Sequence, residues 1–360
     1  MIKILHSADW HLDSPLQGRL PQQAELLRRE LLQIPDRVAA LCREENCDLM
    51  LLAGDLFDGA YSQQTYRAVY DALQSVNVPV FIAPGNHDYI CPDSPYEKEL
   101  WPENVHIFKK QQIEWVDLPA LGLRVYGAGF QSMDCPGLLE GFQAEGFAVG
   151  LFHGDPTQVN SPYNPITKTQ TAQSGLAYLA LGHIHKRGQK QYGNTLCAWP
   201  GCPEGRGFDE LGEKGFYEGT VSDDGAVSLS FVPFARHRYE IVTVDVTGQA
   251  PLAAVEAALP AGGTERDLYR ILLTGETGEG GGGAEAVREA LAERFYALEV
   301  RDNTRMAEDV WRRAGEDSLR GLFLRTLREK LDHAADEAER ETITRAARFG
   351  LAALDHRDMG

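Results

Sequence analysis

Several features are missing from this chain of 360 residues, and each absence excludes a class of protein. No run of 18 apolar residues occurs, so the sequence predicts no membrane-spanning helix. The first motif residue, Asp9, lies so near the start of the sequence that we expect no room for a secretory signal peptide. Its six cysteines are scattered, and such usage is typical of a reducing cytosol. We therefore expect a cytoplasmic protein without membrane contact.

Motifs for structural zinc and for nucleotide phosphates are also missing. Cys42 and Cys47 are separated by four residues, as are Cys197 and Cys202, but neither pair has the partner motif that a structural zinc site needs. The glycine-rich run 275–283 is not followed by Lys-Ser or Lys-Thr, so it does not match a phosphate-binding loop. We interpret this run as a flexible connection.

Positive charge is scarce. The chain has 35 Lys and Arg residues against 53 Asp and Glu residues, which gives a formal net charge of −18. This balance argues against a free-standing protein that binds nucleic acid by electrostatic attraction. Two basic clusters occur, at Lys109-Lys110 and at Lys186-Arg187 with Lys190. We interpret the first cluster as solvated surface. For the second cluster two interpretations stay open: solvated surface, or contact with a ligand.

An ordered set of metal-ligand residue types is present, and each member follows a short apolar run. The patterns are D-x-H at Asp9, G-D-x-x-D at Asp55, G-N-H-D at Asn86, F-H-G at His153 and G-H-x-H at His183. The apolar runs are typical of buried strands, and they cover residues 2–5, 48–53, 78–83, 147–152 and 178–181. Because sites in open α/β sheets form beyond the carboxyl ends of strands, we expect these loops to converge on one sheet edge.

Such a set suits a two-metal phosphoester site. Hydrolysis needs a nucleophile at neutral pH and neutralisation of the phosphoryl oxygens, and two metals about 3.5–4 Å apart provide both. A carboxylate must bridge the two metals, and Asp55 is the natural candidate. Mixed imidazole, carboxylate and amide ligands favour Mn, Fe or Zn over Mg or Ca.

The five motifs resemble those of the calcineurin-like metallophosphoesterases. Within that superfamily, residues 4–12 (ILHSADWHL) are similar to the start of the SbcD and YhaO type of DNA repair exonuclease. Residues 182–186 (GHIHK), 199–203 (WPGCP) and 208–215 (FDELGEKG) resemble the same branch. The resemblance covers roughly residues 1–235. Cys202 departs from the branch, which often has Ser there, but it lies outside the ligand set.

The resemblance implies a role for each site residue. The ligands of one metal are matched by Asp9, His11, Asp55 and His185. Those of the other are matched by Asp55, Asn86, His153 and His183. His87 resembles the residue that protonates the leaving oxygen or stabilises its developing charge, a role that suits imidazole near neutral pH. Asp58 is expected to orient His87 from outside the ligand set.

The order of patterns predicts an α/β (α+β) fold. Residues 1–235 are the expected phosphoesterase (nuclease) domain, and their pattern predicts two packed sheets flanked by helices. Helical patterns cover 23–47, where Pro35 should interrupt or begin a helix, and 63–76. Further strands are expected at 105–108, 113–118, 123–126, 216–221 and 227–232.

The remaining residues divide into two smaller parts. Strand and helix patterns alternate within 236–303, which predicts a small βαβαβ unit in the place of the capping domain that helps the nuclease branch to position DNA. Residues 304–360 are helical by pattern, with a first apolar stripe at Leu319, Leu322, Phe323, Leu327 and Leu331. Two interpretations stay open: a helical hairpin packed on its own chain, or a docking segment for an SMC-like ATPase.

These observations together predict a Mn-dependent DNA nuclease, an exonuclease of DNA repair, that uses two divalent metal ions. Its expected partners are DNA, an SMC-like ATPase and a second copy of the chain. Two alternatives stay open: a phosphodiesterase or phosphatase acting on nucleotides or other small phosphoesters, and a non-catalytic scaffold for a partner ATPase. The complete ligand set argues against the scaffold, and the cap and tail argue against the small-molecule enzyme.

Overall fold

The computed structural model of the protein describes residues 1–16, 21–277, 283–306 and 310–354. Residues 278–282 of the glycine-rich run therefore lie outside the described residues. By its contacts the chain divides into two units. One unit comprises 1–241, 261–270 and 293–298, and the other comprises 242–260, 271–292 and 299–360. The expected domain boundaries at 235 and 303 stay a prediction.

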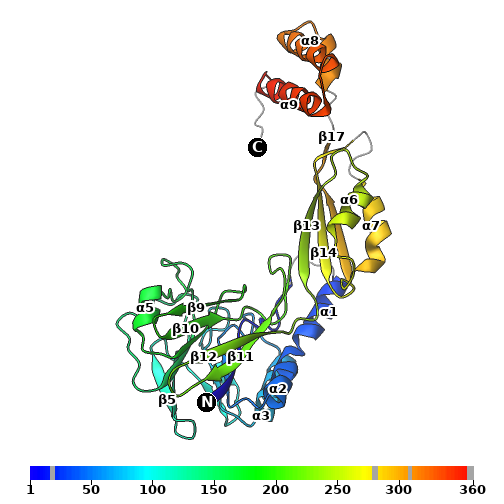
Figure 1. Ribbon diagram of the computed structural model, residues 1–360. Coiled ribbons are helices and arrows are strands. Elements are labelled where there is room, and N and C mark those ends of the chain that lie inside the picture. The colour runs from blue at the N-terminus through cyan, green and yellow to red at the C-terminus, as the bar shows by residue number, and fades with distance from the viewer. Residues whose placement is uncertain (17–20, 278–282, 307–309, 355–360) are drawn as a thin grey trace. The chain divides into compact units, whose positions relative to one another are not determined.

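The first of two six-stranded sheets in the first unit contains the amino-terminal strand (Figure 1). Its strands are β1 (Ile2–Ser7), β2 (Leu49–Leu52), β3 (Val80–Ile82), β4 (Val105–Ile107), β11 (Gly215–Val221) and β12 (Val227–Pro233). They lie in the order β12-β11-β1-β2-β3-β4. The strands from β1 to β4 are parallel, while β11 and β12 are antiparallel additions at one side.

The second sheet lies against the first. Its strands are β5 (Glu114–Leu118), β6 (Leu123–Ala128), β7 (Ala148–His153), β8 (Tyr178–Gly182), β9 (Gly188–Tyr192) and β10 (Thr195–Trp199). Their order is β5-β6-β7-β8-β10-β9, with β6, β7, β8 and β10 parallel. The strands β9 and β10 were not predicted from the sequence, but the predicted two-sheet fold is confirmed.

Both faces of the first sheet are buried, which explains its continuous apolar strands. Successive side chains of a strand point to opposite faces. Leu5 and Met50 pack in the cluster that includes helix residues, whereas Ile4 and Leu51 pack in a second cluster with Val149 and other residues of the second sheet. The hydrophobic core therefore lies in two layers, one on each side of the first sheet.

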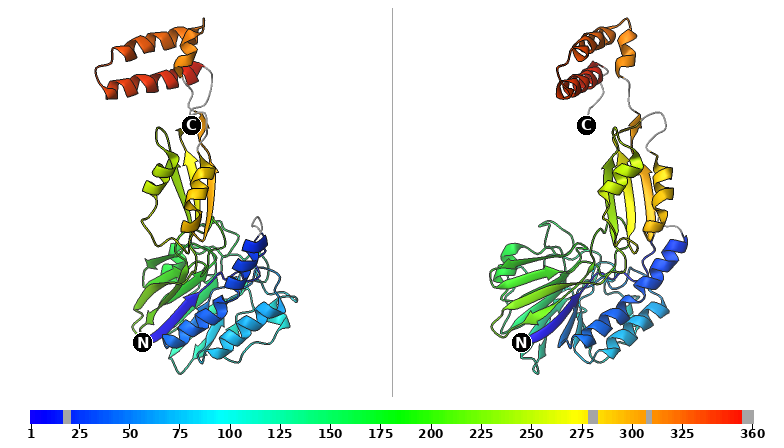
Figure 2. Two further views of the ribbon diagram at one scale, coloured as in Figure 1. Left: turned by 90° about the vertical axis from the view of Figure 1, so that its right-hand side faces the viewer. Right: turned by 45° about the vertical axis from the view of Figure 1, so that its right-hand side comes forward.

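Helices cover the outer face of the first sheet, as both views in Figure 2 show. They are α2 (Ile34–Glu44) and α3 (Gln63–Ser75), while α1 (Pro21–Leu31) precedes them and contributes only its last residue, Leu31, to the same core. Pro35 lies in the first turn of α2, where its missing N–H is tolerated, so the predicted interruption of the helical pattern is present. Two short helices, α4 (Pro95–Lys98) and α5 (Lys168–Gln173), lie in later connections.

Smaller mixed elements follow, and most of their residues belong to the second unit. Strands and helices alternate as β13 (Tyr239–Asp245), α6 (Pro251–Ala258), β14 (Leu268–Thr274), α7 (Ala284–Leu291) and β16 (Ala297–Asp302), with a 3-10 turn η1 (Ala292–Arg294) before the last strand. The three strands form a sheet in the order β13-β14-β16. A separate two-stranded pairing joins β15 (Glu276–Thr277) and β17 (Arg305–Met306). The predicted βαβαβ order is confirmed.

The chain continues into a helical hairpin made of η2 (Val310–Gly315), α8 (Leu319–Asp332) and α9 (Glu337–Leu354). Its small core contains Leu324 and Leu351, with Phe323 and Leu327 packed against them. Leu322 of the predicted stripe is instead 56% exposed. Two further apolar side chains of the hairpin are exposed as well, Leu319 at 69% and Phe349 at 55%. Over the ranges that the structure describes, no helix combines the length and apolar character needed to cross a membrane.

Candidate metal centre

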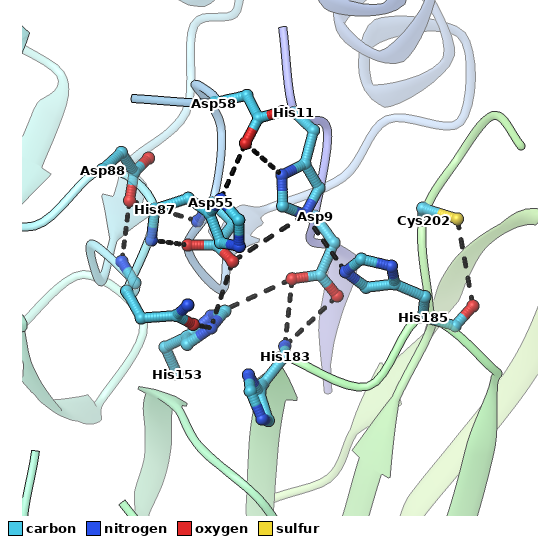
Figure 3. A network of polar contacts seen from close by, with 12 residues as sticks. Asp9, His11, Asp55, Asp58, His87, Asp88, His153, His183, His185 and Cys202 are labelled. Carbon is cyan, nitrogen blue, oxygen red and sulfur yellow. Dashed lines mark hydrogen bonds and ion pairs between the residues drawn. The ribbon is translucent and has the colours of Figure 1, made fainter. Parts of the chain in front are cut away.

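Five loops at the carboxyl ends of β1, β2, β3, β7 and β8 bring predicted site residues together between the two sheets (Figure 3). These strands are parallel within their sheets, so their carboxyl ends share one edge of each sheet. The loops contribute Asp9 and His11 after β1, Asp55 and Asp58 after β2, Asn86 and His87 after β3, His153 at the end of β7, and His183 and His185 after β8.

The backbone of these loops is strained at ligand-type residues. The φ angle is 53° at Asp9, 46° at His11, 50° at Asp55 and 93° at His183. A non-glycine residue at positive φ costs of order 1–3 kcal/mol and persists only where its surroundings determine it. Here the Asp9 N–H donates to the Gly54 carbonyl at 3.0 Å, and the His11 N–H donates to the Asp55 carbonyl at 2.9 Å. Such a concentration of strain indicates a functional site.

Two motif glycines allow the loops to approach each other. A Cβ atom at Gly85 would lie 2.3 Å from Oδ1 of Asp55, and one at Gly182 would lie 1.9 Å from the Ala53 carbonyl oxygen. Neither neighbour can move without displacing a strand end or a ligand-type carboxylate. Glycine in these motifs is therefore required by packing at the site.

One ligand group contains Asp9, His11 and His185, whose candidate ligand atoms lie within 4.8 Å of one another. The Nε2 atoms of the two histidines are 3.1 Å apart. Nδ1 of His185 donates to Oε1 of Glu210 at 2.7 Å, so in the neutral ring Nε2 carries the lone pair. That lone pair faces the other imidazole, and a shared cation would satisfy both rings.

The second ligand group contains Asp9, Asp55 and His153. The His153 Nδ1–H donates to the Ala53 carbonyl oxygen at 2.9 Å, which leaves Nε2 as an acceptor. Nε2 lies 3.0 Å from Oδ1 of Asn86 and 3.4 Å from Oδ2 of Asp55. Three acceptor atoms therefore converge with no donor between them, and this arrangement fits a metal ion.

His183 is placed differently from the other predicted ligands. Its main-chain N–H donates to Oδ1 of Asp9 at 2.9 Å. Its ring packs at 75° to the ring of His153, with 5.2 Å between centroids, and lies 4.8 Å from the ring of Tyr163. Within the described ranges the ring is in none of the ligand groups, so its role as a ligand stays a prediction.

His87 and Asp58 form a hydrogen-bonded pair, and together with His11 they make up a third group of candidate ligand atoms. Nδ1 of His87 donates to Oδ1 of Asp58 at 2.7 Å, and the main-chain N–H of His87 donates to Oδ1 of Asp55 at 2.9 Å. The hydrogen bond to Asp58 raises the pKa of His87. Burial opposes ionisation of Asp58, but hydrogen bonds from His11, His87 and Ser14 lower its pKa overall. The predicted contact between these two residues is present.

Buried charge at the site requires a cation. Asp9 and Asp55 are 0% and 2% exposed, and burial raises the pKa of Asp55 to about 6. Burial lowers the pKa of His11 and of His183 to about 3, so these rings are neutral near pH 7. Two buried carboxylates beside these two neutral rings are stabilised by a compensating positive charge. A divalent metal supplies that charge and uses the ligand types present.

His6, which lies in the first motif outside the ligand pattern, belongs to the core instead. It is 0% exposed, its Nδ1 lies 2.7 Å from the Tyr178 hydroxyl, and its Nε2 lies 3.1 Å from the Leu181 carbonyl oxygen. Both ring nitrogens therefore have hydrogen-bond partners away from the ligand groups.

Asp88 is a site residue for which the sequence predicted no role. Its buried carboxylate accepts hydrogen bonds from the N–H groups of Gly85 at 2.8 Å and Leu56 at 2.7 Å and from the Tyr96 hydroxyl at 2.6 Å. Further N–H groups, those of Asp55 and Phe57, lie at 3.3 Å. Asp88 therefore ties the loop after β2 to the loop after β3. The G-N-H-D motif contained this residue but gave no sign of its task.

Glu210 and Arg206 form a second support that sequence spacing could not reveal. Nη2 of Arg206 donates to Oε1 of Glu210 at 2.7 Å, and its Nη1 lies 3.7 Å from Oδ2 of Asp58. Glu210 in turn holds His185. Burial opposes ionisation of Glu210, but the hydrogen bonds from His185 and Arg206 lower its pKa. Only the resemblance at residues 208–215 pointed to this segment.

Comparisons with known proteins found several similar chains. The uncharacterized metallophosphoesterase YhaO of Bacillus subtilis is 32% identical over 275 residues, which cover 71% of this chain and 65% of the relative. The D component of the nuclease SbcCD of Bacillus subtilis is 25% identical over 262 residues, which cover 59% and 64%. The chain thus spans slightly less than two thirds of each relative. A Thermus thermophilus protein of known crystal structure matches with a TM-score of 0.40 and 13% identity, over 64% of this chain and 98% of that one.

The two relatives confirm the resemblance to the SbcD and YhaO branch. The family model described as calcineurin-like phosphoesterase matches residues 2–187, which include every predicted ligand. Since that match extends over more than half of the 360 residues, this chain belongs to the calcineurin-like phosphoesterase family.

Proposed function

We propose that this chain is a metal-dependent phosphodiesterase whose substrate is DNA, acting as an exonuclease in DNA repair. The observation that carries the proposal is the hydrogen bond of His87 to Asp58, within the partly exposed group that these two residues form with the buried His11. A proton donor is useful next to a phosphoester only if the leaving group is a poor one, such as the sugar oxygen of a nucleic acid. The complete ligand set supports an enzyme over a scaffold.

The ligand types support two divalent metal ions, with Mn as our first choice and Fe or Zn as alternatives. One ion would be held by Asp9, His11, Asp55 and His185, and the other by Asp55, Asn86, His153 and His183. When bound, these ions would supply a water of lowered pKa and neutralise the phosphoryl oxygens.

The protein's own part in the reaction falls to His87. Asp58 accepts the Nδ1 proton of the ring, so Nε2 is the nitrogen free to deliver a proton to the leaving oxygen. The main-chain hydrogen bond from His87 to Asp55 fixes this donor relative to the ligands. Because Asp58 raises the pKa of His87, the ring retains its proton near neutral pH, which general acid catalysis requires.

Two observations favour DNA as the substrate. One relative is a component of a nuclease, and Lys186 and Lys190 lie exposed just after the last ligand. Within the described part of the chain, no carboxylate lies within 4 Å of either Nζ. Lys109 and Lys110 are instead paired with carboxylates at the surface. Arg187 of the cluster near His185 is paired with Glu213, so Lys186 and Lys190 are the better candidates for phosphate contacts.

A partner protein is part of the proposal. The net charge of −18 leaves the chain poorly suited to hold DNA alone, and the similar nuclease protein is named as one of the subunits of SbcCD. We propose that an SMC-like ATPase docks on the exposed apolar residues of the hairpin, with a second copy of the chain as a further partner. The candidate docking residues are Leu319, Leu322 and Phe349, which are exposed.

The test is incubation of the full chain and Mn with end-labelled duplex and single-stranded DNA, beside bis(p-nitrophenyl) phosphate. Shortening of DNA from one end that stops when a chelator is added supports the proposal. Hydrolysis of the aryl ester without cleavage of DNA would instead favour an enzyme of small phosphoesters. Bound metal with no hydrolysis of any substrate would favour a scaffold.

A further inference from the structure

A pocket of about 390 Å³ adjoins His87 on the surface of the first unit. Its walls include Gly59, Ala60 and Tyr61 from the loop after β2, and His87, Tyr89 and Pro95 from the segment after β3. This volume lies in the lower part of the range of roughly 300–1,000 Å³ found for small-molecule pockets. A larger cavity of about 820 Å³ lies at the amino ends of β7 and β8, away from the ligands, and has none of the predicted site residues in its lining.

The walls of the smaller pocket suit a flat ring. Tyr61 and Tyr89 are both partly buried. The Tyr61 hydroxyl donates to Oε1 of Glu99 at 2.9 Å, and its ring lies 5.8 Å from the ring of Phe57. The Tyr61 ring is therefore held in place before any ligand arrives, which reduces the entropy cost of binding.

The charges of the pocket argue against a phosphate as its occupant. No Lys or Arg is in its lining, which instead includes Asp88 and Asp93. Asp88 is saturated by donors from the loops. Asp93 is exposed and paired with Lys98 at 2.6 Å. A neutral aromatic group fits these surroundings better than an anion does, because the lining contains two carboxylates and no Lys or Arg.

The ring of His87 is a wall shared by the pocket and the ligand groups. Its side chain is 44% exposed, and its ring centroid lies 4.8 Å from that of His11. A group bonded to the oxygen that receives the proton of His87 must extend from the neighbourhood of this ring. The pocket is therefore placed to receive the leaving part of the substrate.

We propose that this pocket binds the nucleobase of the leaving nucleoside, with Tyr61 and Tyr89 as its stacking surfaces. The inference rests on the proposed function and deepens it, because a base in a pocket must be unpaired. The substrate class is therefore a single-stranded or locally opened DNA end. Stacking tolerates any base, so the pocket selects for the presence of a base and not for its identity.

The test uses the full chain with Mn and two single-stranded oligonucleotides. One carries a normal base on the leaving nucleoside, and the other carries an abasic tetrahydrofuran residue there, so the scissile phosphodiester is the same. Base stacking on an aromatic side chain corresponds to about 5- to 150-fold in binding. We expect the wild type to prefer the base-bearing oligonucleotide in kcat/KM by a factor in this range.

Two variants decide whether Tyr89 causes that preference. Tyr89→Ala should bring the ratio of the two kcat/KM values close to one, while Tyr89→Phe keeps the ring and should keep the ratio. Metal content and circular dichroism confirm that both variants fold. A wild-type ratio of one, or a Tyr89→Ala ratio equal to that of the wild type, overturns the pocket assignment and leaves the proposed nuclease function standing. If the wild type cleaves neither oligonucleotide but hydrolyses the aryl ester, the proposed function and the pocket assignment fail together.

Discussion

At the carboxyl edge of the two sheets, four ligand-type residues have positive φ angles and two carboxylates are almost fully buried. In the described residues from 310 to 354, no residue has a positive φ, and the few buried positions are mainly apolar. In the first region the backbone conformation and the buried charge are both unfavourable, and a bound cation would compensate for them. The hairpin is locally favourable and leaves apolar side chains exposed.

The difference shows what each region needs from outside. Burial of Asp9 and Asp55 costs free energy that protein contacts do not offset, so the sheet edge points to a metal. The hairpin already has its own small core in Leu324 and Leu351, so its fold needs no partner. Only its exposed residues are available for docking. Substitutions at single positions in each region can therefore test this difference.

The largest effect is expected at Asp55, which lies between the two ligand groups. Its Oδ2 is 3.4 Å from Nε2 of His153 and 3.8 Å from Nε2 of His11. Asp55→Ala should lose both metal ions and reduce hydrolysis to background, because Asp55 is the carboxylate proposed to bridge them. Elemental analysis measures the loss. The control Asp117→Ala, at a surface carboxylate paired with Arg124, should keep its metal. Full occupancy in Asp55→Ala would remove the basis of the assignment.

A smaller effect is expected from His87, which is proposed to donate a proton and not to bind metal. His87→Ala should retain metal but lose roughly 10²–10⁴-fold in DNA hydrolysis, with a smaller loss on an aryl ester whose leaving group needs little protonation. Equal losses on both substrates would argue against the acid role.

The pH dependence of DNA hydrolysis tests the same role of His87 as a proton donor. The donor form of His87 exists below its pKa, so activity should fall as the pH rises through that value. Asp58 raises this pKa, and Asp58→Asn should therefore move the falling limb to lower pH. An unmoved limb in this variant would show that another group sets it.

The hairpin is tested by two leucines two positions apart. Leu324 is 0% exposed and Leu322 is 56% exposed. Leu324→Ser should destabilise the hairpin by about 2–5 kcal/mol, as for a large-to-small core change, while Leu322→Ser should stay within about 0.5 kcal/mol of the wild type. Urea unfolding followed by circular dichroism measures both. A large loss in Leu322→Ser would mean that this residue belongs to the protein's own core and not to a docking face.

A pH-dependent effect is expected at a buried charge that lies outside the ligand groups. Nδ1 of His237 donates to the Arg266 carbonyl oxygen at 2.5 Å, and Nε2 donates to Oε1 of Glu30 at 3.0 Å. Both partners are acceptors, so the bonded ring carries two protons. Burial opposes this, but the hydrogen bonds to Glu30 and Arg266 raise the pKa of His237 above 6.5.

The stabilising effect of His237 should depend on pH in one direction. Its contribution is complete below the unfolded pKa and is lost as the pH rises through the raised folded value. His237→Asn should cost about 1.5–3 kcal/mol at low pH and progressively less above neutrality, without loss of metal. Thermal unfolding across pH measures this. A cost that stays constant with pH would contradict the double protonation.

Much of the fold was predictable because burial imposes the same requirement for apolar side chains along a whole segment. The parallel strands are buried on both faces, so Leu49–Leu52 is a continuous apolar run. β9 was not predictable in this way, since its sequence GQKQY is polar at the sheet edge. The apolar stripe of α8 was only a partial guide: it included the exposed Leu322 and omitted the buried Leu324. A helical period alone does not say which side meets a neighbour.

The predicted site residues lie together because motifs after parallel strands share an edge. Their supports were beyond prediction for a different reason. Glu210 reaches His185 across 25 residues, and a pairing of that kind depends on the folded path of the chain. The contact of Asp58 with His87 was predictable because both belong to the resemblance.

Asp88 has a consequence for how the centre becomes loaded. Its carboxylate holds the amides of Gly85 and Leu56 inside the protein, so these amides should exchange slowly with deuterated solvent even after a chelator has removed all metal. The loops that carry Asp55 and Asn86 are then ordered before an ion arrives. Loading requires little rearrangement of the chain, and the centre should refill on addition of the ion without a slow refolding phase.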